Sequence, residues 1–210
     1  MVAVLLVSMH ISVAAMLYHQ TNSAGLMAGT FTPRMTTDPE FIEFYVSPNS
    51  TFSALAPYVR TGITSWNSSA DEIDLTETTS YSTSICDVKG YNGNSSANED
   101  KRNLLGYTIV YCGSGAYGNN VAYDDSSEIP SDYSLSEIFI NYAKFPSSDL
   151  SSSAVQRKLK VTAAHEMGHV LGLGHVTSTA YIMYDEYNTS QPDEPTTAEK
   201  EAVRDLYNYR

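Results

Sequence analysis

Basic residues are scarce in this sequence, and long apolar runs are absent from it. Lysine and arginine together number 12 against 24 aspartates and glutamates, which gives a formal net charge of −12 at pH 7. A surface of that sign repels phosphate backbones, so the composition argues against nucleic acid as a partner. The most apolar stretch, Met1–Leu17, is too short and too interrupted by polar residues to predict a membrane-spanning helix.

The N-terminal segment also lacks positive charge, because no lysine or arginine precedes Arg34. Its length and the small residues Ala14 and Ala24 still fit a secretory signal peptide, which would make the protein secreted and extracellular. Residues 1–24 are therefore expected to be either a signal peptide or an uncleaved N-terminal anchor, and only the anchor implies a membrane. Residues 25–40 show no periodicity and predict a linker or short propeptide, which leaves residues 41–210 as the folded domain.

Cysteine is also rare, with only Cys86 and Cys112 in 210 residues. In an exported protein such an isolated pair is most simply explained by one disulfide bond, which stabilises by about 3 kcal/mol if unstrained. A thiolate that blocks a metal in a latent form is the alternative. The chain is long enough to bury a core without a metal, so a bound metal need not be structural.

Hydrophobic periodicity predicts a single α+β domain in which most strands precede the last two helices. The expected strands are Phe41–Val46, the Ile73 to Thr76 stretch, Cys86–Tyr91, Leu104–Tyr111 and Ile138–Tyr142, with a turn region at Gly113–Asn120. The expected helices are Phe52–Trp66, a helix that runs from the Ser147–Ser153 cap region into His165, and Thr196–Tyr209, which starts with a capping box from Thr196 to Glu199.

Two histidines four residues apart, His165 and His169, form the core of the chemically informative motif. Positions four apart on a helix differ by only about 40° around the axis, so both imidazoles can bind one metal ion. Glu166 lies about 100° away from His165, which suits a group that hydrogen-bonds a metal-bound water instead of the metal. The spacing predicts two metal ligands with a carboxylate beside them.

The motif continues with Gly172 and His175, which supply a turn and a third ligand. Glycine adopts a left-handed conformation without a Cβ penalty, so the helix can end at Gly172 and the chain can return with His175. Three nitrogen ligands leave the fourth position of a tetrahedral zinc to water, as in a catalytic site. Zinc lowers the pKa of its water to about 7, and Glu166 can then act as the general base.

A chance match is the alternative explanation, because a His-Glu-x-x-His pattern alone occurs on ordinary helices. Each further fixed position, Gly172 and His175, makes chance roughly tenfold less frequent. The sequence has five histidines, and the two outside the motif, His10 and His19, lie in or beside the predicted signal segment. All three histidines of the expected domain therefore belong to the motif.

The pattern His165-Glu166-x-x-His169-x-x-Gly172-x-x-His175 resembles that of the metzincin zinc endopeptidases. Met183 and Tyr184 shortly after it look like the matrixin form of the Met-turn. The resemblance implies a metzincin-like fold, with a twisted, mostly parallel sheet of about five strands, an antiparallel edge strand and three helices, among them an active-site helix and a C-terminal helix.

The same resemblance implies roles for residues around the motif. Met183 would form an apolar floor beneath the ligands without binding the metal, although an ordinary core methionine predicts almost the same packing. Tyr184 is a candidate for substrate binding and not for the metal. The strand Ile138–Tyr142 would be the sheet edge on which a substrate lies, or alternatively a buried strand. The expected domain has no spare histidine for a second zinc, and calcium stays an open possibility that no motif indicates.

These observations predict a secreted, monomeric zinc metalloendopeptidase that binds protein or peptide substrates in extended form and uses one catalytic Zn²⁺. A non-catalytic, zinc-stabilised extracellular binding module is the first alternative. A structural zinc has no use for a general base beside an open position, so Glu166 favours the enzyme. A zinc hydrolase of another substrate class is the second alternative, and only the family resemblance weighs against it.

Overall fold

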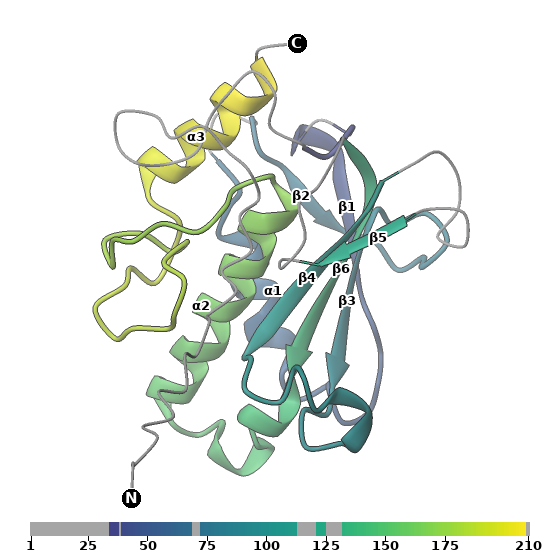
Figure 1. Ribbon diagram of the computed structural model, residues 1–210, viewed down its shortest axis with the longest axis vertical. Helices are drawn as coiled ribbons and strands as arrows, with labels where there is room; N and C mark the ends of the chain where they lie inside the picture. The colour runs from purple at the N-terminus through teal and green to yellow at the C-terminus, as the bar shows by residue number, and fades with distance from the viewer. Residues whose placement is uncertain (1–33, 38, 69–71, 113–120, 125–131, 209–210) are drawn as a thin grey trace, which may run out of the picture.

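The described residues form one sheet of six strands, three α-helices and several short 3-10 helices (Figure 1). The computed structural model describes residues 34–208 except residues 38, 69–71, 113–120 and 125–131. The strands are β1 (Ile42–Val46), β2 (Leu75–Glu77), β3 (Cys86–Tyr91), β4 (Gly106–Cys112), β5 (Val121–Asp124) and β6 (Tyr133–Asn141). The α-helices are α1 (Ala56–Thr64), α2 (Ser153–Val170) and α3 (Thr197–Asn208). None of these helices is long and apolar enough to cross a membrane.

The strand order is β2-β1-β3-β6-β4-β5. The first four strands are parallel to one another, whereas β4 runs antiparallel to both β6 and β5. This arrangement confirms the predicted α+β class with a mostly parallel sheet, an antiparallel edge and three helices. Strand β5 was not predicted, and the expected turn region at Gly113–Asn120 lies outside the described residues.

Helices α1 and α2 cover one face of the sheet and pack closely against each other (Figure 1). The inward residues of β1, Ile42 and Phe44, are fully buried. A Cβ at Gly62 of α1 would lie only 2.3 Å from the carbonyl oxygen of Lys160, so glycine is required where the two helices meet. The indole N–H of Trp66 donates to the carbonyl oxygen of Ala164 at 2.7 Å and so ties the residue before His165 to the end of α1.

Helix α1 is shorter than the predicted helix Phe52–Trp66, because it begins at Ala56. Hydrogen-bonded turns precede it, with the N–H of Leu55 donating to the carbonyl oxygen of Phe52 at 2.9 Å. Pro57 lies in the first turn, where its missing N–H costs no helical bond. Phe52 is still fully buried, so the apolar periodicity correctly indicated a buried face but not the helix start.

The position of the strand predicted at Ile138–Tyr142 requires a correction. It is part of β6, which lies inside the sheet with β3 on one side and β4 on the other. The edge-strand hypothesis for this segment was therefore wrong, and the alternative of a buried strand holds. The residues facing the helices, Ile138 and Ile140, are fully buried, which explains why their β-branched run gave a strong strand signal.

The predicted disulfide bond between Cys86 and Cys112 is not formed. Cys86 pairs with Ser136 and Cys112 pairs with Tyr133, so β6 separates the two cysteine-bearing strands. Two strand spacings amount to about 9.6 Å, beyond the Cα separation that a disulfide bridges. Burial raises the pKa of the Cys86 thiol to about 12, so it is neutral near pH 7 and does not supply the metal-blocking thiolate considered as the alternative.

The N-terminal part of the chain is described only from Arg34 onward. Residues 1–24, expected to be a signal peptide or anchor, lie outside the described residues, as do residues 25–33 of the expected linker. From Arg34 onward the chain packs against the start of β6. Met35 is fully buried and forms a parallel bridge with Tyr133, and the N–H of Thr36 donates to the carbonyl oxygen of Tyr133 at 2.7 Å.

Candidate metal centre

The last two turns of α2 carry His165 and His169 on one face, as the spacing of four residues predicts. Their Nε2 atoms lie 3.1 Å apart, and the two rings meet edge to face with centroids 4.7 Å apart. Ser152 occupies the N-cap position of this helix, within the predicted cap region. Helix α2 therefore delivers two imidazole nitrogens to one point in space.

Helix α2 ends in a Schellman motif, a helix end closed by two backbone hydrogen bonds and a left-handed residue. Gly172 has φ 92°, as predicted from its identity. The N–H of Gly172 donates to the carbonyl oxygen of His169 at 3.0 Å, and the N–H of Leu173 donates to that of Gly168 at 2.9 Å. The motif reverses the chain within three residues, which is what allows His175 to return to the helix.

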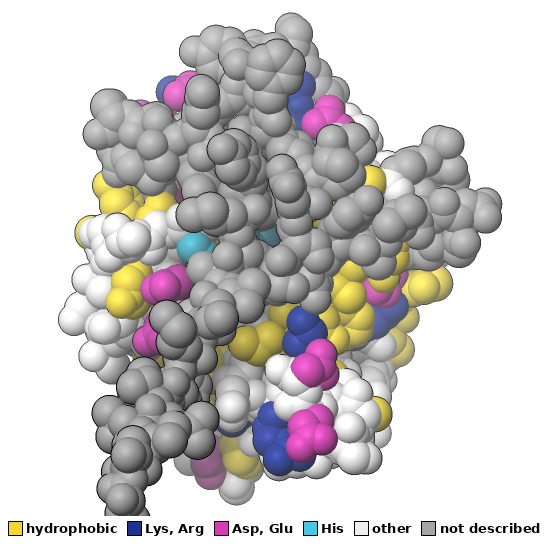
Figure 2. All heavy atoms as spheres, viewed as in Figure 1, with side chains coloured by type: hydrophobic (Ala, Val, Ile, Leu, Met, Phe, Trp, Pro, Cys, Tyr) yellow, Lys and Arg dark blue, Asp and Glu magenta, His cyan; other side chains and the backbone are white. Residues whose placement is uncertain are grey.

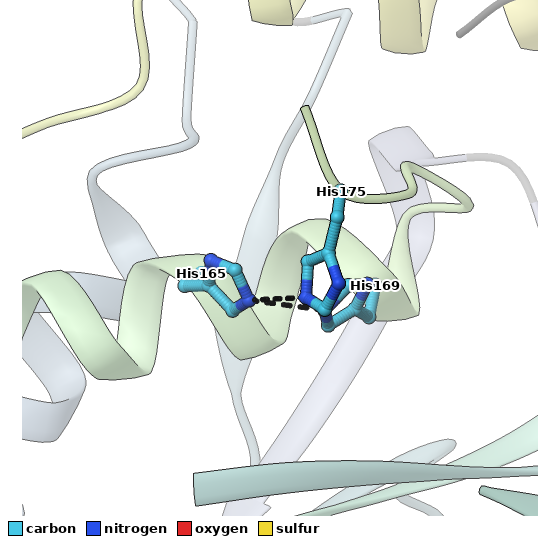
Figure 3. A group of neighbouring side chains, drawn as sticks. All are labelled: His165, His169 and His175. Atoms are coloured by element: carbon cyan, nitrogen blue, oxygen red, sulfur yellow. Dashed lines mark hydrogen bonds between the residues drawn. The ribbon is translucent and has the colours of Figure 1, made fainter. Parts of the chain in front are cut away.

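His175 completes a triangle of imidazole nitrogens (Figure 3). Its Nε2 lies 3.0 Å from Nε2 of His165 and 3.1 Å from Nε2 of His169. The N–H of Val176 donates to the carbonyl oxygen of Met183 at 2.9 Å and so fixes the segment that carries His175. Histidine side chains are visible from outside on the face of the molecule shown in Figure 2. The three residues predicted as metal ligands are thus brought together.

Backbone carbonyls set the tautomers of two of these histidines. Nδ1 of His165 lies 2.9 Å from the carbonyl oxygen of Ile182, and Nδ1 of His169 lies 2.9 Å from that of Leu173. A carbonyl oxygen only accepts, so each Nδ1 must carry the proton and each Nε2 presents a lone pair. Burial and a neighbouring imidazole lower the pKa of both His165 and His175 to about 3, so neither ring is charged near neutral pH.

The donor set fits a zinc ion. Three nitrogen donors with mutual distances of 3.0–3.1 Å converge on one point, with lone pairs that repel one another unless a cation lies between them. Tetrahedral zinc with Zn–N bonds of about 2.1 Å requires donors about 3.4 Å apart, close to this triangle. Three protein nitrogens leave one coordination position for water or substrate, which is the composition of a catalytic zinc site.

Glu166 is next to the first ligand in sequence but points to the sheet. Its side chain is 5% exposed, and its Oε2 lies 2.9 Å from the hydroxyl oxygen of Thr108 on β4. A Cβ at Gly106 would lie 3.0 Å from Oε1, so the backbone of β4 passes directly beneath the carboxylate. Among the described residues, the converging donor group consists of the three histidines and does not include Glu166.

Met183 and Tyr184 follow the ligands at the expected Met-turn. Met183 is fully buried, and a Cβ at Gly168 would lie 2.2 Å from its Sδ, so the thioether packs against α2 one residue before His169. This packing is what both the apolar floor and an ordinary core methionine predict. Tyr184 is partly buried and forms an isolated parallel bridge with Val176, which places it beside the segment carrying His175.

Three residues that support the site were missed by sequence reasoning. The side-chain amide of Gln191 donates at 3.2 Å to the carbonyl oxygen of Ile182, the same oxygen that orients His165. The hydroxyl of Tyr133 donates at 2.9 Å to the carbonyl oxygen of Val170 at the end of α2. Thr108 is the third, through its contact with Glu166. Each is remote in sequence from the motif, and no local pattern distinguishes it from an ordinary polar residue.

Comparisons with known proteins place this geometry in context. The model of the family described as Matrixin matches residues 47–208. A comparison with curated proteins gave no match. Among solved structures, a zinc-dependent peptidase from Methanocorpusculum labreanum is 10% identical, with a TM-score of 0.38 over 78% of this chain and 100% of that chain. A likeness of that size carries no weight for fold or function.

Proposed function

We propose that this chain, which belongs to the matrixin family of metallopeptidases, is a zinc-dependent endopeptidase that cleaves extended protein segments. The observation that carries this proposal is the convergence of three imidazole nitrogens within 3.1 Å, two of them on the helix that also carries the buried carboxylate of Glu166. A purely structural zinc needs four protein ligands and no neighbouring base. The described residues supply three such ligands, and Glu166 directly follows the first of them in the sequence.

Each residue of the site has a distinct part in this mechanism. His165, His169 and His175 would hold the zinc through Nε2. A zinc ion held there would polarise the scissile carbonyl and make the attacking water acidic near neutral pH. Glu166 would accept the proton of that water on its carboxylate and pass it to the leaving amine nitrogen. Burial of Glu166 limits competing contacts with bulk water and keeps this transfer local.

The substrate would lie along β4, not along β6. The N–H of Asn141 donates to the carbonyl oxygen of Leu105, so these two opposite residues form a hydrogen-bonded pair. Hydrogen-bonded and non-hydrogen-bonded pairs alternate along the antiparallel strands β4 and β6, so the backbone N–H and C=O groups of Gly106 and Thr108 point away from β6. The described part of β5 pairs only with Ile109–Cys112. We therefore propose that an extended peptide adds to the outer edge of Gly106–Thr108, directly beneath Glu166. Tyr184 stays a candidate for contact with that peptide.

Zinc content and proteolysis of unfolded casein, with and without phenanthroline, test the proposed function. We expect one zinc per chain and cleavage that the chelator abolishes. Zinc without cleavage would favour the alternative of a non-catalytic, zinc-stabilised binding module. Protein that binds no zinc would contradict the proposal.

We further propose that the enzyme is secreted and acts as a monomer. The support for secretion is the apolar segment Met1–Leu17 with small residues at Ala14 and Ala24. N-terminal sequencing of protein from the medium of expressing cells tests it: a mature chain starting within residues 15–40 would support a cleaved signal, and protein held in the membrane fraction with Met1 intact would support the anchor instead.

A further inference from the structure

Thr108 is the polar residue of β4 that faces α2. It is 3% exposed, and its hydroxyl oxygen lies 2.9 Å from Oε2 of Glu166 and 3.0 Å from the backbone carbonyl oxygen of the same residue. Both contacts join β4 to α2, and the two residues are 58 positions apart in the sequence. Glu166 is thus held by a strand as well as by its own helix.

The two acceptors compete for one hydroxyl proton. The carbonyl oxygen of Glu166 lies within α2, where the N–H of Val170 is its regular partner. Oε2 belongs to a carboxylate, and hydrogen bonds to an ionised acceptor are about twice as strong as neutral ones. The hydroxyl proton of Thr108 is therefore directed mainly to Oε2.

We infer that Thr108 is a positioning residue for the general base, an inference that rests on the proposed function. The hydroxyl of Thr108 holds Oε2 and so sets the orientation of the carboxylate that would exchange the proton with water and the leaving amine. Gly106 keeps space beside the other oxygen, because a Cβ there would lie 3.0 Å from Oε1. The two residues of β4 together fix how the carboxylate is oriented.

The same residue also connects the base to the proposed substrate edge. The backbone groups of Thr108 point away from β6, toward the edge where the peptide would add, while its side chain points to Glu166. A peptide bound to that edge and the carboxylate would therefore both take their positions from one residue of β4. Loss of the hydroxyl should change turnover while leaving peptide binding intact.

Three variants test this inference in the zinc-loaded protein. Thr108→Val removes the hydroxyl and keeps the shape, and Thr108→Ser restores it. Thr162→Val is the matched control, because Thr162 is also buried and its hydroxyl donates to a carbonyl oxygen of the same helix, that of Lys158, at 2.9 Å. We expect Thr108→Val to lower kcat by about tenfold or more, with KM changed by less than about twofold. Thr108→Ser should recover most of kcat, and Thr162→Val should retain it.

Other outcomes overturn the inference in identifiable ways. A Thr108→Val enzyme with unchanged kcat, or a Thr162→Val enzyme that loses as much, would show that the hydroxyl does not act through Glu166. Thermal unfolding of Thr108→Val, Glu166→Ala and the double variant measures the contact without turnover, and non-additive midpoint shifts are expected. Additive shifts would contradict the contact. If the shifts are non-additive but the wild-type protein cleaves no substrate, the contact between Thr108 and Glu166 exists and the proposed function is wrong. The positioning role then fails together with that function.

Discussion

The carboxylate of Glu199 accepts a hydrogen bond from the backbone N–H of Met183 at 3.0 Å. Its other oxygen accepts from the N–H of Thr196 at 2.8 Å and from the Thr196 hydroxyl at 2.9 Å. One fully buried side chain therefore closes the N-terminus of α3, as the predicted capping box requires, and also holds the turn that packs under the metal centre. Glu199 therefore connects the C-terminal helix to the Met-turn through its hydrogen bonds.

Glu199→Ala should therefore destabilise the protein more than the loss of an ordinary cap. We expect the free energy of unfolding to fall by about 2–4 kcal/mol, because the variant leaves the buried N–H of Met183 and the partly buried donors of Thr196 without this acceptor. Chemical denaturation measures this loss. Glu201→Ala, an exposed position in the same helix, is the control and should change stability by less than about 0.5 kcal/mol. Equal losses in both variants would contradict the described contact.

Gly168→Ala should disrupt the packing of Met183. The added methyl would lie 2.2 Å from Sδ of Met183 and 3.0 Å from a ring carbon of Trp66 in a closed core. We expect a net loss of about 1–3 kcal/mol of stability, since overpacking outweighs the gain in helix propensity. In the double variant Gly168→Ala and Met183→Ala, the second change makes room for the first, so its loss should be less than the sum. Additive losses would show that the two residues do not touch.

The two cysteines should behave as buried thiols. Because β6 separates their strands, we expect two thiols per chain to react with Ellman's reagent after denaturation without reductant. The native protein should react slowly, and a reducing agent should leave its melting temperature unchanged. Detection of no thiol after denaturation, or a melting temperature that falls on reduction, would reinstate the disulfide.

The parts of the site that the sequence predicted are those with local signals. The spacing of His165 and His169 determines their shared helix face, and Gly172 has the left-handed φ of 92° that its lack of a side chain allows. The capping box from Thr196 to Glu199 is likewise formed. In each case, residues within a few positions of one another determine the geometry.

The parts that could not be predicted depend on strand order. The apolar run around Ile138 is equally compatible with an edge and an interior strand, because both bury the same side chains. The position of β6 between β3 and β4 is a long-range property, and it decides both the missing disulfide and the place of the proposed substrate edge. Thr108 was missed for the same reason, since only the sheet brings it to Glu166, 58 positions away.

Comparison of the wild type with Glu166→Gln tests most directly whether this is a zinc site with a carboxylate base. Zinc content and the rate of casein cleavage are measured on the same preparations. We expect one zinc per chain in both proteins and a cleavage rate lower by about 10²–10⁴-fold in the variant. A Glu166→Gln variant that keeps its zinc and cleaves at the wild-type rate would contradict the proposed mechanism.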